Sequence, residues 1–219
     1  MYLQRRAVLR AAVALGSAGL FSAVPAWAQR SSAVRVKREE PIIRRVEFNP
    51  RRPPRDMPPL TPPEAGVCLT TFELGANVTY SAERIARNRA RVYVDELDLV
   101  TRLKFDIYTV RDAPPKLRAH EEGHREIGEH FYASAPQIAA DIGRRLIGAT
   151  FEGTGDSDAA AQRDGFEQVV AAIERDYMTR VRVPSAAANE RFDAITNHGL
   201  DPIDEAEAVR LAIDASSRL

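Results

Sequence analysis

Residues 120–130 read His-Glu-Glu-Gly-His-Arg-Glu-Ile-Gly-Glu-His, and this stretch, with its pattern H-E-x-x-H, decides the expected fold. On a helix, residues four apart lie about one turn apart on the same face, so His120 and His124 can direct two imidazoles at one ion. Glu121 is rotated away from this pair and can face a water molecule on the same metal. Two nitrogen ligands and a carboxylate that accepts a proton are typical of zinc hydrolases. The stretch therefore predicts zinc bound by His120 and His124, with Glu121 as the general base.

The residues around the motif predict that it lies on a partly buried helix. Asp112-Ala113-Pro114-Pro115 places prolines at early positions, where a helix tolerates them. From there one continuous helical stripe is formed by Leu117, His120, His124, Ile127 and Phe131. The histidines are therefore expected on the buried face, and Ser134 and Pro136 are expected to end or kink the helix.

A catalytic zinc usually takes three protein ligands and leaves a fourth position for water, so one more ligand is needed. Three of the four histidines lie in the motif stretch, and the fourth is His198. We rank His198 first, because Gly199 permits an unusual backbone turn that can present the ring to the site. A glutamate from a later helix, Glu174 or Glu167, ranks second, and His130 ranks third.

His130 matches the spacing of the metzincin pattern H-E-x-x-H-x-x-G-x-x-H, but Ile127 stands where that pattern has its glycine. On a continuous helix His130 lies about 9 Å along the axis from His124 and roughly 120° around it. Both rings cannot then reach one zinc ion. His130 is expected beside the site or at the surface.

Composition gives no sign of a nucleic-acid-binding protein. The chain of 219 residues has 31 Lys and Arg against 31 Asp and Glu, and 44% of its residues are hydrophobic, as in ordinary soluble proteins. Cys68 is the single cysteine, so no disulfide can form within the chain. Stability is expected from a hydrophobic core, with a contribution from bound metal.

Residues 1–28 are predicted to be a cleaved export signal, which implies a periplasmic or secreted protein. Arg5-Arg6 precedes an apolar run over 11–24, and Ala26-Trp27-Ala28 offers a cleavage site. The arginine pair also resembles a twin-arginine signal, with a general secretion signal as the alternative. Beyond residue 28 no apolar run approaches the ~18 residues that span a bilayer.

Residues 29–66 are predicted to form a linker, because eight of the fourteen prolines lie between Pro41 and Pro63 among several arginines. A solvated spacer is the preferred interpretation, and weak contact of the basic segment with an anionic envelope surface is the alternative. A short strand at Arg44–Phe48 is also considered. The remaining residues, 67–219, have a length that suits one domain.

The secondary structure expected within 67–219 mixes strands and helices. A strand is predicted over Val67–Leu74, broken at Gly75, with Ser81 capping a short helix through Arg89. Alternating apolar residues over Arg91–Val110 predict two antiparallel strands that turn near 100–102. Further helices are expected from about 157 and from Asp201, with a loop over Pro184–Ala188.

A second block, Phe192-Asp193-Ala194-Ile195-Thr196-Asn197-His198-Gly199, follows the motif at a distance. Together the two blocks resemble the bacterial family of exported proteins termed domain of unknown function 922, with H-E-Q-G-H and a distal Y-D-x-x-T-x-H-G, over roughly residue 67 to the end. The resemblance implies a zincin-type metallopeptidase. Glu122 replaces the glutamine and Phe192 the tyrosine. If that phenol stabilises an oxyanion in relatives, Tyr177 or Tyr132 is expected to replace it.

The sequence therefore predicts an α+β, zincin-like domain, in which a small and mostly antiparallel sheet packs on the H-E-x-x-H helix and further helices follow. Zinc is expected on His120, His124 and His198, with hydrolysis of a peptide, protein or related amide through Glu121. An edge strand within Arg91–Val110 can hold an extended peptide. The alternative is a non-catalytic zinc-binding envelope protein.

Overall fold

The computed structural model describes residues 33–60 and 64–216, so the predicted export signal lies outside the described residues. The strands are β1 (Val34–Arg38), β2 (Ile42–Phe48), β3 (Gly66–Ala86), β4 (Arg89–Val110) and β5 (Thr150–Thr154). The helices are α1 (Pro115–Ala133), α2 (Ala135–Leu146), α3 (Asp158–Tyr177), the π-helical turn η1 (Met178–Arg182), α4 (Val183–Thr196) and α5 (Glu205–Ser216). Within these ranges no helix has the length and apolar character needed to cross a bilayer.

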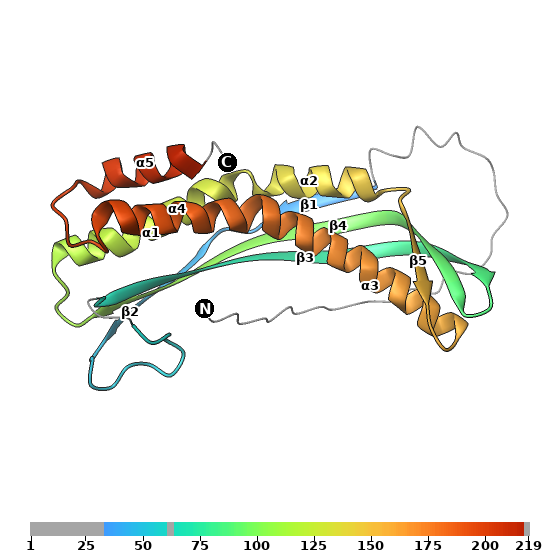
Figure 1. Ribbon diagram of the computed structural model, residues 1–219, viewed down its shortest axis with the longest axis horizontal. Helices are drawn as coiled ribbons and strands as arrows, with labels where there is room; N and C mark the ends of the chain where they lie inside the picture. The colour runs from blue at the N-terminus through green and yellow to red at the C-terminus, as the bar shows by residue number, and fades with distance from the viewer. Residues whose placement is uncertain (1–32, 61–63, 217–219) are drawn as a thin grey trace. The chain divides into compact units, whose positions relative to one another are not determined.

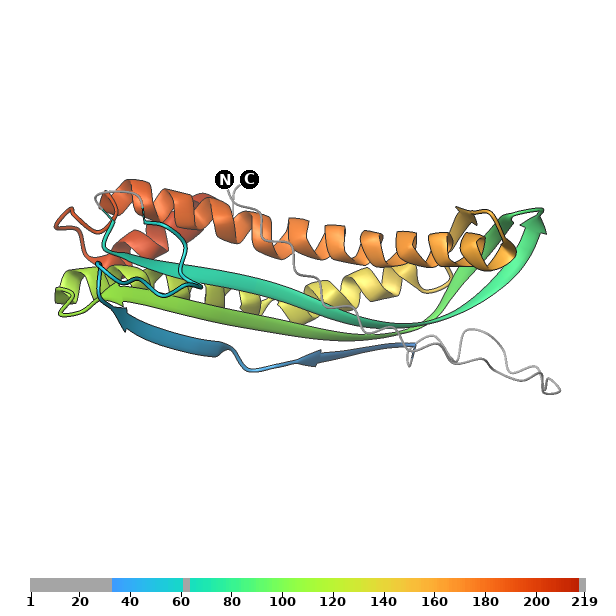
Figure 2. The same cartoon turned by 90° about the horizontal axis from the view of Figure 1, so that it is seen from below.

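The five strands form one mixed sheet in which β4 pairs with all the others. β1 and β2 run parallel to β4, with Val34 opposite Leu97 and Ile42 opposite Lys104, whereas β5 is antiparallel to β4. Only two residues join β3 to β4, too few for a parallel crossover, so these strands form an antiparallel hairpin. β4 thus lies between β3 and the strands β1 and β2 (Figure 2). The predicted α+β class is confirmed. The predicted mostly antiparallel sheet is wrong, because β1 and β2 pair with β4 in parallel and make the sheet mixed.

β3 and β4 are much longer than the sequence predicted. β3 continues through Gly75 and through the segment from Ser81 that was predicted to be helical. β4 is one strand of 22 residues, without the predicted turn at 100–102. Every second residue of β4 is buried up to Val94. The two residues Asp95 and Glu96 are then both exposed, and the alternation resumes with Leu97 buried and continues without a break through Thr101. The prediction of two strands was wrong. Residues 100–102 contain no glycine or proline that would break a strand, so the chain continues through them as one strand.

The proline- and arginine-rich segment 29–66, predicted to be a linker, contains β1 and β2. The short strand considered at Arg44–Phe48 is confirmed as part of β2. Two exposed arginines of β2 form ion pairs with other elements, Arg44 with Asp106 of β4 at 2.5 Å and Arg45 with Glu122 of α1 at 2.7 Å. Residues 42–48 are therefore a structural element and not a spacer.

The helices agree better with the sequence. α1 is confirmed as the motif helix, ends at Ala133 as Ser134 suggested, and carries Pro115 at its start. α3 begins at Asp158, close to the predicted position, while the last helix starts at Glu205, later than expected. The loop predicted over Pro184–Ala188 is wrong, because Pro184 occupies the first turn of α4, where its missing N–H costs nothing.

The chain forms two compact units, each assembled from separate segments. Unit 1 comprises the described residues up to 38 with 74–101 and 136–177, and unit 2 comprises 39–73, 102–135 and 178 onward. In unit 2 the helices α1, α4 and α5 lie side by side (Figure 1). They enclose a core formed by Ile127, Ala188, Phe192, Ala208, Val209 and Ala212. Both blocks singled out from the sequence, 120–130 and 192–199, belong to unit 2.

Candidate metal centre

α1 presents its motif residues toward the interior of unit 2. His120 and Glu121 are each only 3% exposed. The helix lies tightly against the sheet at Gly128, where an added Cβ would come within 2.6 Å of the Phe105 ring and 3.1 Å of Thr70. A glycine is therefore required at this position of the helix, and the close approach fixes the height of α1 over β3 and β4.

Phe192 of α4 packs on the two motif histidines. Its ring stacks on His120 with centroids 4.8 Å apart and meets His124 edge-on at 5.0 Å. Gly123 makes room for this ring, because an added Cβ there would lie 2.5 Å from Phe192 Cζ. Gly123 and Phe192 thus form one packing unit that holds both imidazoles in place.

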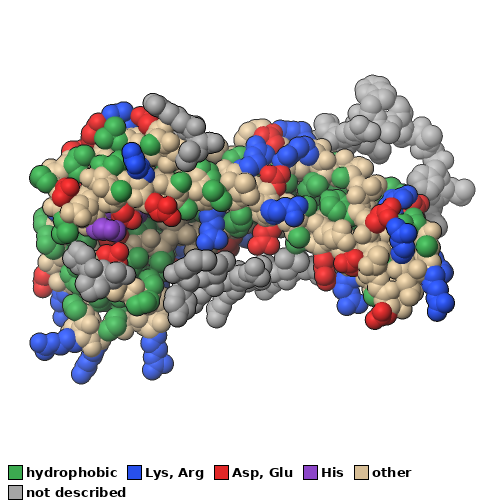
Figure 3. Space-filling view, in the orientation of Figure 1, with side chains coloured by type: hydrophobic (Ala, Val, Ile, Leu, Met, Phe, Trp, Pro, Cys, Tyr) green, Lys and Arg blue, Asp and Glu red, His purple; other side chains and the backbone are tan. Residues whose placement is uncertain are grey.

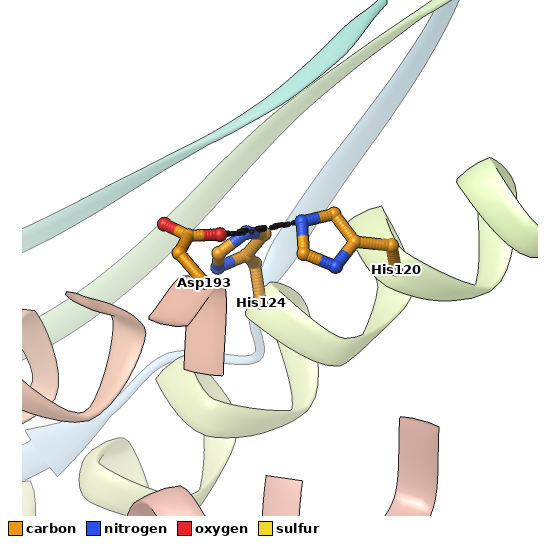
Figure 4. A group of neighbouring side chains, drawn as sticks. All are labelled: His120, His124 and Asp193. Carbon is orange, nitrogen blue, oxygen red and sulfur yellow. Dashed lines mark hydrogen bonds and ion pairs between the residues drawn. The ribbon is translucent and has the colours of Figure 1, made fainter. Parts of the chain in front are cut away.

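The structure brings His120, His124 and Asp193 together as a group with three converging ligand atoms (Figure 4). The Nε2 atoms of the two histidines lie 3.2 Å apart. Asp193 Oδ1 lies 3.3 Å from His120 Nε2 and 3.1 Å from His124 Nε2. Asp193 lies five residues before His198 in the second sequence block, and the sequence alone did not identify it as a ligand.

These separations fit a tetrahedral ion. Ligand atoms at about 2.0–2.1 Å from zinc, at tetrahedral angles, lie about 3.3 Å from one another. The triangle formed by the three atoms, with edges of 3.1–3.3 Å, is therefore one face of such a tetrahedron. Imidazole nitrogen and carboxylate oxygen are also the donor types that zinc takes in catalytic sites.

Each imidazole has an oxygen partner beside Nδ1, which favours the tautomer that leaves Nε2 free to coordinate. The Asn189 amide donates to Ser185 O at 2.8 Å, so Asn189 Oδ1 is left to accept from His124 Nδ1 at 2.6 Å. The Thr196 hydroxyl donates to Phe192 O at 2.8 Å and can accept from His120 Nδ1 at 3.4 Å. Such partners orient metal-binding histidines and raise their basicity. Sequence reasoning missed Asn189, for which a single sequence carries no signal beyond its position four residues before Asp193.

Glu121 is buried beside the three ligand atoms. Gly66 of β3 leaves room for its side chain, since a Cβ there would lie 2.6 Å from Glu121 Oε1. Within the described part of the chain, the other oxygen, Oε2, is buried without a hydrogen-bond partner. Burial raises the pKa of Glu121 to about 7, and the Asp193 and Glu64 carboxylates act in the same direction. An unpartnered buried carboxylate oxygen needs a donor, and a water molecule in the adjoining cavity would supply one.

Charge within the group favours an anionic Asp193. Burial alone would raise the pKa of Asp193, but hydrogen bonds with His120 and His124 hold it well below its usual range. Burial alone would lower the pKa of His124, but Asp193 and Glu121 raise it above its ordinary value. Asp193 and His124 thus stabilise each other's charged forms.

The candidates for the third ligand are placed differently by the structure. His198 Nδ1 lies 3.8 Å from Asp193 Oδ1 and 3.8 Å from Glu64 Oε1, outside the triangle but next to it. The space-filling view shows histidine atoms at the surface, with acidic side chains close by (Figure 3). Glu167 and Glu174 are exposed on α3 in unit 1, and His130 is exposed on α1 against Phe131. His198 stays a predicted ligand, and Asp193 joins it as the nearer candidate.

The backbone around His198 confirms the unusual turn expected from Gly199. Three consecutive residues have left-handed conformations, Asn197 at φ 48°, His198 at φ 54° and Gly199 at φ 76°. Such a conformation is costly for residues with side chains and is found where the surrounding structure enforces it. Gly199 also backs onto the site, since a Cβ there would lie 2.9 Å from His120 Cγ.

A cavity of about 320 Å³ adjoins the centre within unit 2. Its lining includes the three ligand candidates, Glu121, His198, the start of β3 and part of α4. Neither tyrosine considered as an oxyanion donor lines it. Tyr132 is buried and donates to Glu39 O at 2.7 Å, and Tyr177 is buried at the end of α3.

No protein-family model, curated protein or solved structure matches the chain. The resemblance stated from the sequence therefore rests on the two motif blocks alone. What the site can do follows from its own residues.

Proposed function

We propose that the protein is an exported zinc-dependent peptidase of the zincin type. The observation that supports this most strongly is the buried Glu121 carboxylate, with one unpartnered oxygen, beside a triangle of ligand atoms with edges of 3.1–3.3 Å. A site that only staples the fold needs no such carboxylate. The proposed export rests on residues 1–28, and the proposed family on the two motif blocks.

In the proposed reaction, His120, His124 and Asp193 hold the metal, and the cavity receives the amide to be cleaved. Zinc in such a site supplies a Lewis acid that acidifies water and polarises a carbonyl group. Glu121 accepts the proton of the attacking water and passes it to the leaving nitrogen. Its burial supports this role, because a pKa near neutrality suits a group that must both take and release a proton.

The second candidate, a non-catalytic zinc-binding protein, is favoured by the position of His198. Its Nδ1 lies 3.8 Å from Asp193 Oδ1, so a small side-chain movement would add it to the ligand set. Four protein ligands would close the coordination sphere, as in structural zinc sites. The role of His198 therefore separates the two functions.

The test uses the chain without residues 1–28, supplied with zinc and measured for bound metal by mass spectrometry. We expect one zinc per chain, lost in His120→Ala and Asp193→Ala and kept in His130→Ala and His198→Ala. Glu121→Gln should keep the metal and abolish cleavage of any peptide that the parent protein cleaves. Loss of metal in His198→Ala, with no cleavage by the parent, would support the closed site. A parent protein that takes up no zinc would refute both candidates.

A further inference from the structure

The cavity beside the metal centre has a single lysine or arginine among its described lining residues, Arg182. The other charged groups of the lining are Glu64, Glu121 and Asp193. Two of these acidic groups face histidines, since Asp193 lies against His120 and His124, and Glu64 lies 3.8 Å from His198. Among the lining residues that the structure describes, Arg182 is thus the one permanent cation that a molecule in this cavity would meet.

No carboxylate of the described residues pairs with Arg182, and it takes part in no side-chain hydrogen bond among them. Two other arginines of unit 2 are paired within the protein, Arg45 with Glu122 at 2.7 Å and Arg125 with Glu129 at 2.5 Å. A guanidinium carries five N–H donors in a planar fork that matches a carboxylate. The fork of Arg182 is therefore available to a ligand.

The chain departs from α-helical geometry at Arg182, which lines the cavity. Arg182 is the last residue of the π-helical turn η1 and immediately precedes α4. Pro184 follows, and in a regular α-helix its ring would clash with the carbonyl of Arg180. The wider π turn avoids that clash and rotates Arg182 from the direction that a continuous α-helix would give it. Single π turns of this kind are frequent at functional sites.

We propose that Arg182 binds a carboxylate of the substrate, and that the protein acts on peptides with a carboxylate close to the bond that is cleaved. The position of that bond rests on the proposed function of the metal centre. An acidic side chain and a free C-terminus offer the same planar carboxylate. Arg182 is accordingly a specificity-determining residue, separate from the groups that perform the chemistry.

The experiment measures binding, so that it does not depend on hydrolysis. The probes are fluorescein-labelled alanine hexapeptides with one Glu or Gln at each position in turn, with free or amidated C-termini. Binding is followed by fluorescence anisotropy on Glu121→Gln protein supplied with zinc, alone and combined with Arg182→Gln or Arg182→Lys. Arg191→Gln is the matched control, because it removes the same charge from a residue that is exposed on α4 and does not line the cavity.

We expect at least one probe with a carboxylate to bind about 10- to 100-fold more tightly than its amide counterpart. Arg182→Gln should abolish this difference without changing the affinity of the amide probe. Arg182→Lys should keep part of it, and Arg191→Gln all of it. The Glu and Gln probes report on a side-chain carboxylate, and the free and amidated probes on a terminal one.

A preference that survives Arg182→Gln, or the absence of any preference in the parent, overturns the inference. The proposed function is judged separately, by cleavage of the same peptides by the wild-type protein. Binding through Arg182 without cleavage would refute the hydrolysis and leave the carboxylate site standing. Cleavage at equal rates of Glu and Gln peptides, and of free and amidated peptides, would support the hydrolysis and refute the carboxylate site.

Discussion

Asn189 shows how a residue that touches no metal can control the candidate centre. Its Oδ1 lies 2.6 Å from His124 Nδ1, and its amide nitrogen is anchored on Ser185 O. The imidazole is thereby fixed both in rotation and in tautomer. Without that partner, His124 could place its proton on Nε2, the atom that the triangle needs free.

Replacing Asn189 tests this role directly. Asn189→Leu should lower zinc affinity roughly 10- to 100-fold, because it removes the acceptor at similar size. Asn189→Asp keeps an acceptor for His124 Nδ1 and should bind zinc about as well as the parent. Competition with a chelator of known affinity measures both. Equal losses in the two variants would show that Asn189 acts by packing alone.

Gly123 is the second residue at which the site depends on a single contact. Gly123→Ala would place a Cβ 2.5 Å from Phe192 Cζ, and the ring cannot withdraw because it is fully buried between α1 and the core. We expect a loss of about 1–3 kcal/mol in the free energy of unfolding, with weaker zinc binding. In the background Phe192→Leu the same change should be harmless or stabilising, since alanine favours a helix by about 1 kcal/mol over glycine. Thermal or denaturant unfolding of the four proteins gives the coupling.

If Gly123→Ala costs the same in both backgrounds, the contact with Phe192 is not its cause. The pattern H-E-Q-G-H, which the sequence resembles, also has a glycine at the position of Gly123, but a sequence pattern gives no structural reason for it. The structure supplies one, because only a residue without a side chain lets the α4 ring stack on His120.

At the scale of elements, the sequence predicted what local periodicity determines. The helix α1 followed from its apolar stripe, and its end followed from Ser134 and Pro136. β2 was foreseen only in part, because a strand rich in arginine and bordered by prolines resembles a spacer until its partner is known. Its arginines are explained by Asp106 and Glu122, which lie more than 60 positions away in the sequence.

The candidate site shows the same division. His120, Glu121 and His124 follow from the spacing of one helix. Asp193 could not be chosen from the sequence, because α4 carries several polar residues and only the packing of α4 against α1 decides which one reaches the histidines. His198 attracted attention because histidines are rare in this chain, whereas aspartates are common.

The pairing of β2 with β4 can be tested through Asp106. Its side chain is 11% exposed and lies between Arg44 and Lys104. Burial alone would raise the pKa of Asp106, but hydrogen bonds from Lys104 and Arg44 hold it below its ordinary value. A carboxylate whose pKa is lowered by folding contributes stability above its unfolded pKa of about 3.9, and this contribution is lost as the pH falls through the folded pKa.

Asp106→Asn should therefore lower the free energy of unfolding by about 1–3 kcal/mol at pH 7, with a smaller deficit at pH 3. The control is Asp98→Asn on the same strand, whose side chain is 39% exposed and pairs with Arg35 of β1. A surface pair of this kind should contribute less than about 1 kcal/mol. Urea unfolding at the two pH values measures both variants, and a deficit of Asp106→Asn that does not change with pH would contradict the assignment.

At the scale of the whole molecule, the candidate centre belongs to one of two compact units. All three ligand candidates, Glu121 and the cavity lining lie in unit 2, on segments that come from both sides of the 136–177 segment in the sequence. Unit 1 has its own contacts, such as Gly143 against Val34 and Gly165 against Val92. A ligand that binds only unit 2 raises the free energy of the opening reactions that disrupt unit 2. It leaves the free energy of other opening reactions unchanged.

Hydrogen exchange with and without zinc should therefore divide the molecule. At a free zinc concentration 100 times the dissociation constant, the stabilisation is about 2.7 kcal/mol. Amides of α1 and α4 that exchange through opening of the site should then slow roughly 100-fold, while those of α3 in unit 1 keep their rates. Asp193→Asn should remove most of the effect in α1 and α4 and leave α3 unchanged. Equal slowing in α3 would mean that the two units open together, so that the metal stabilises the molecule as one cooperative body.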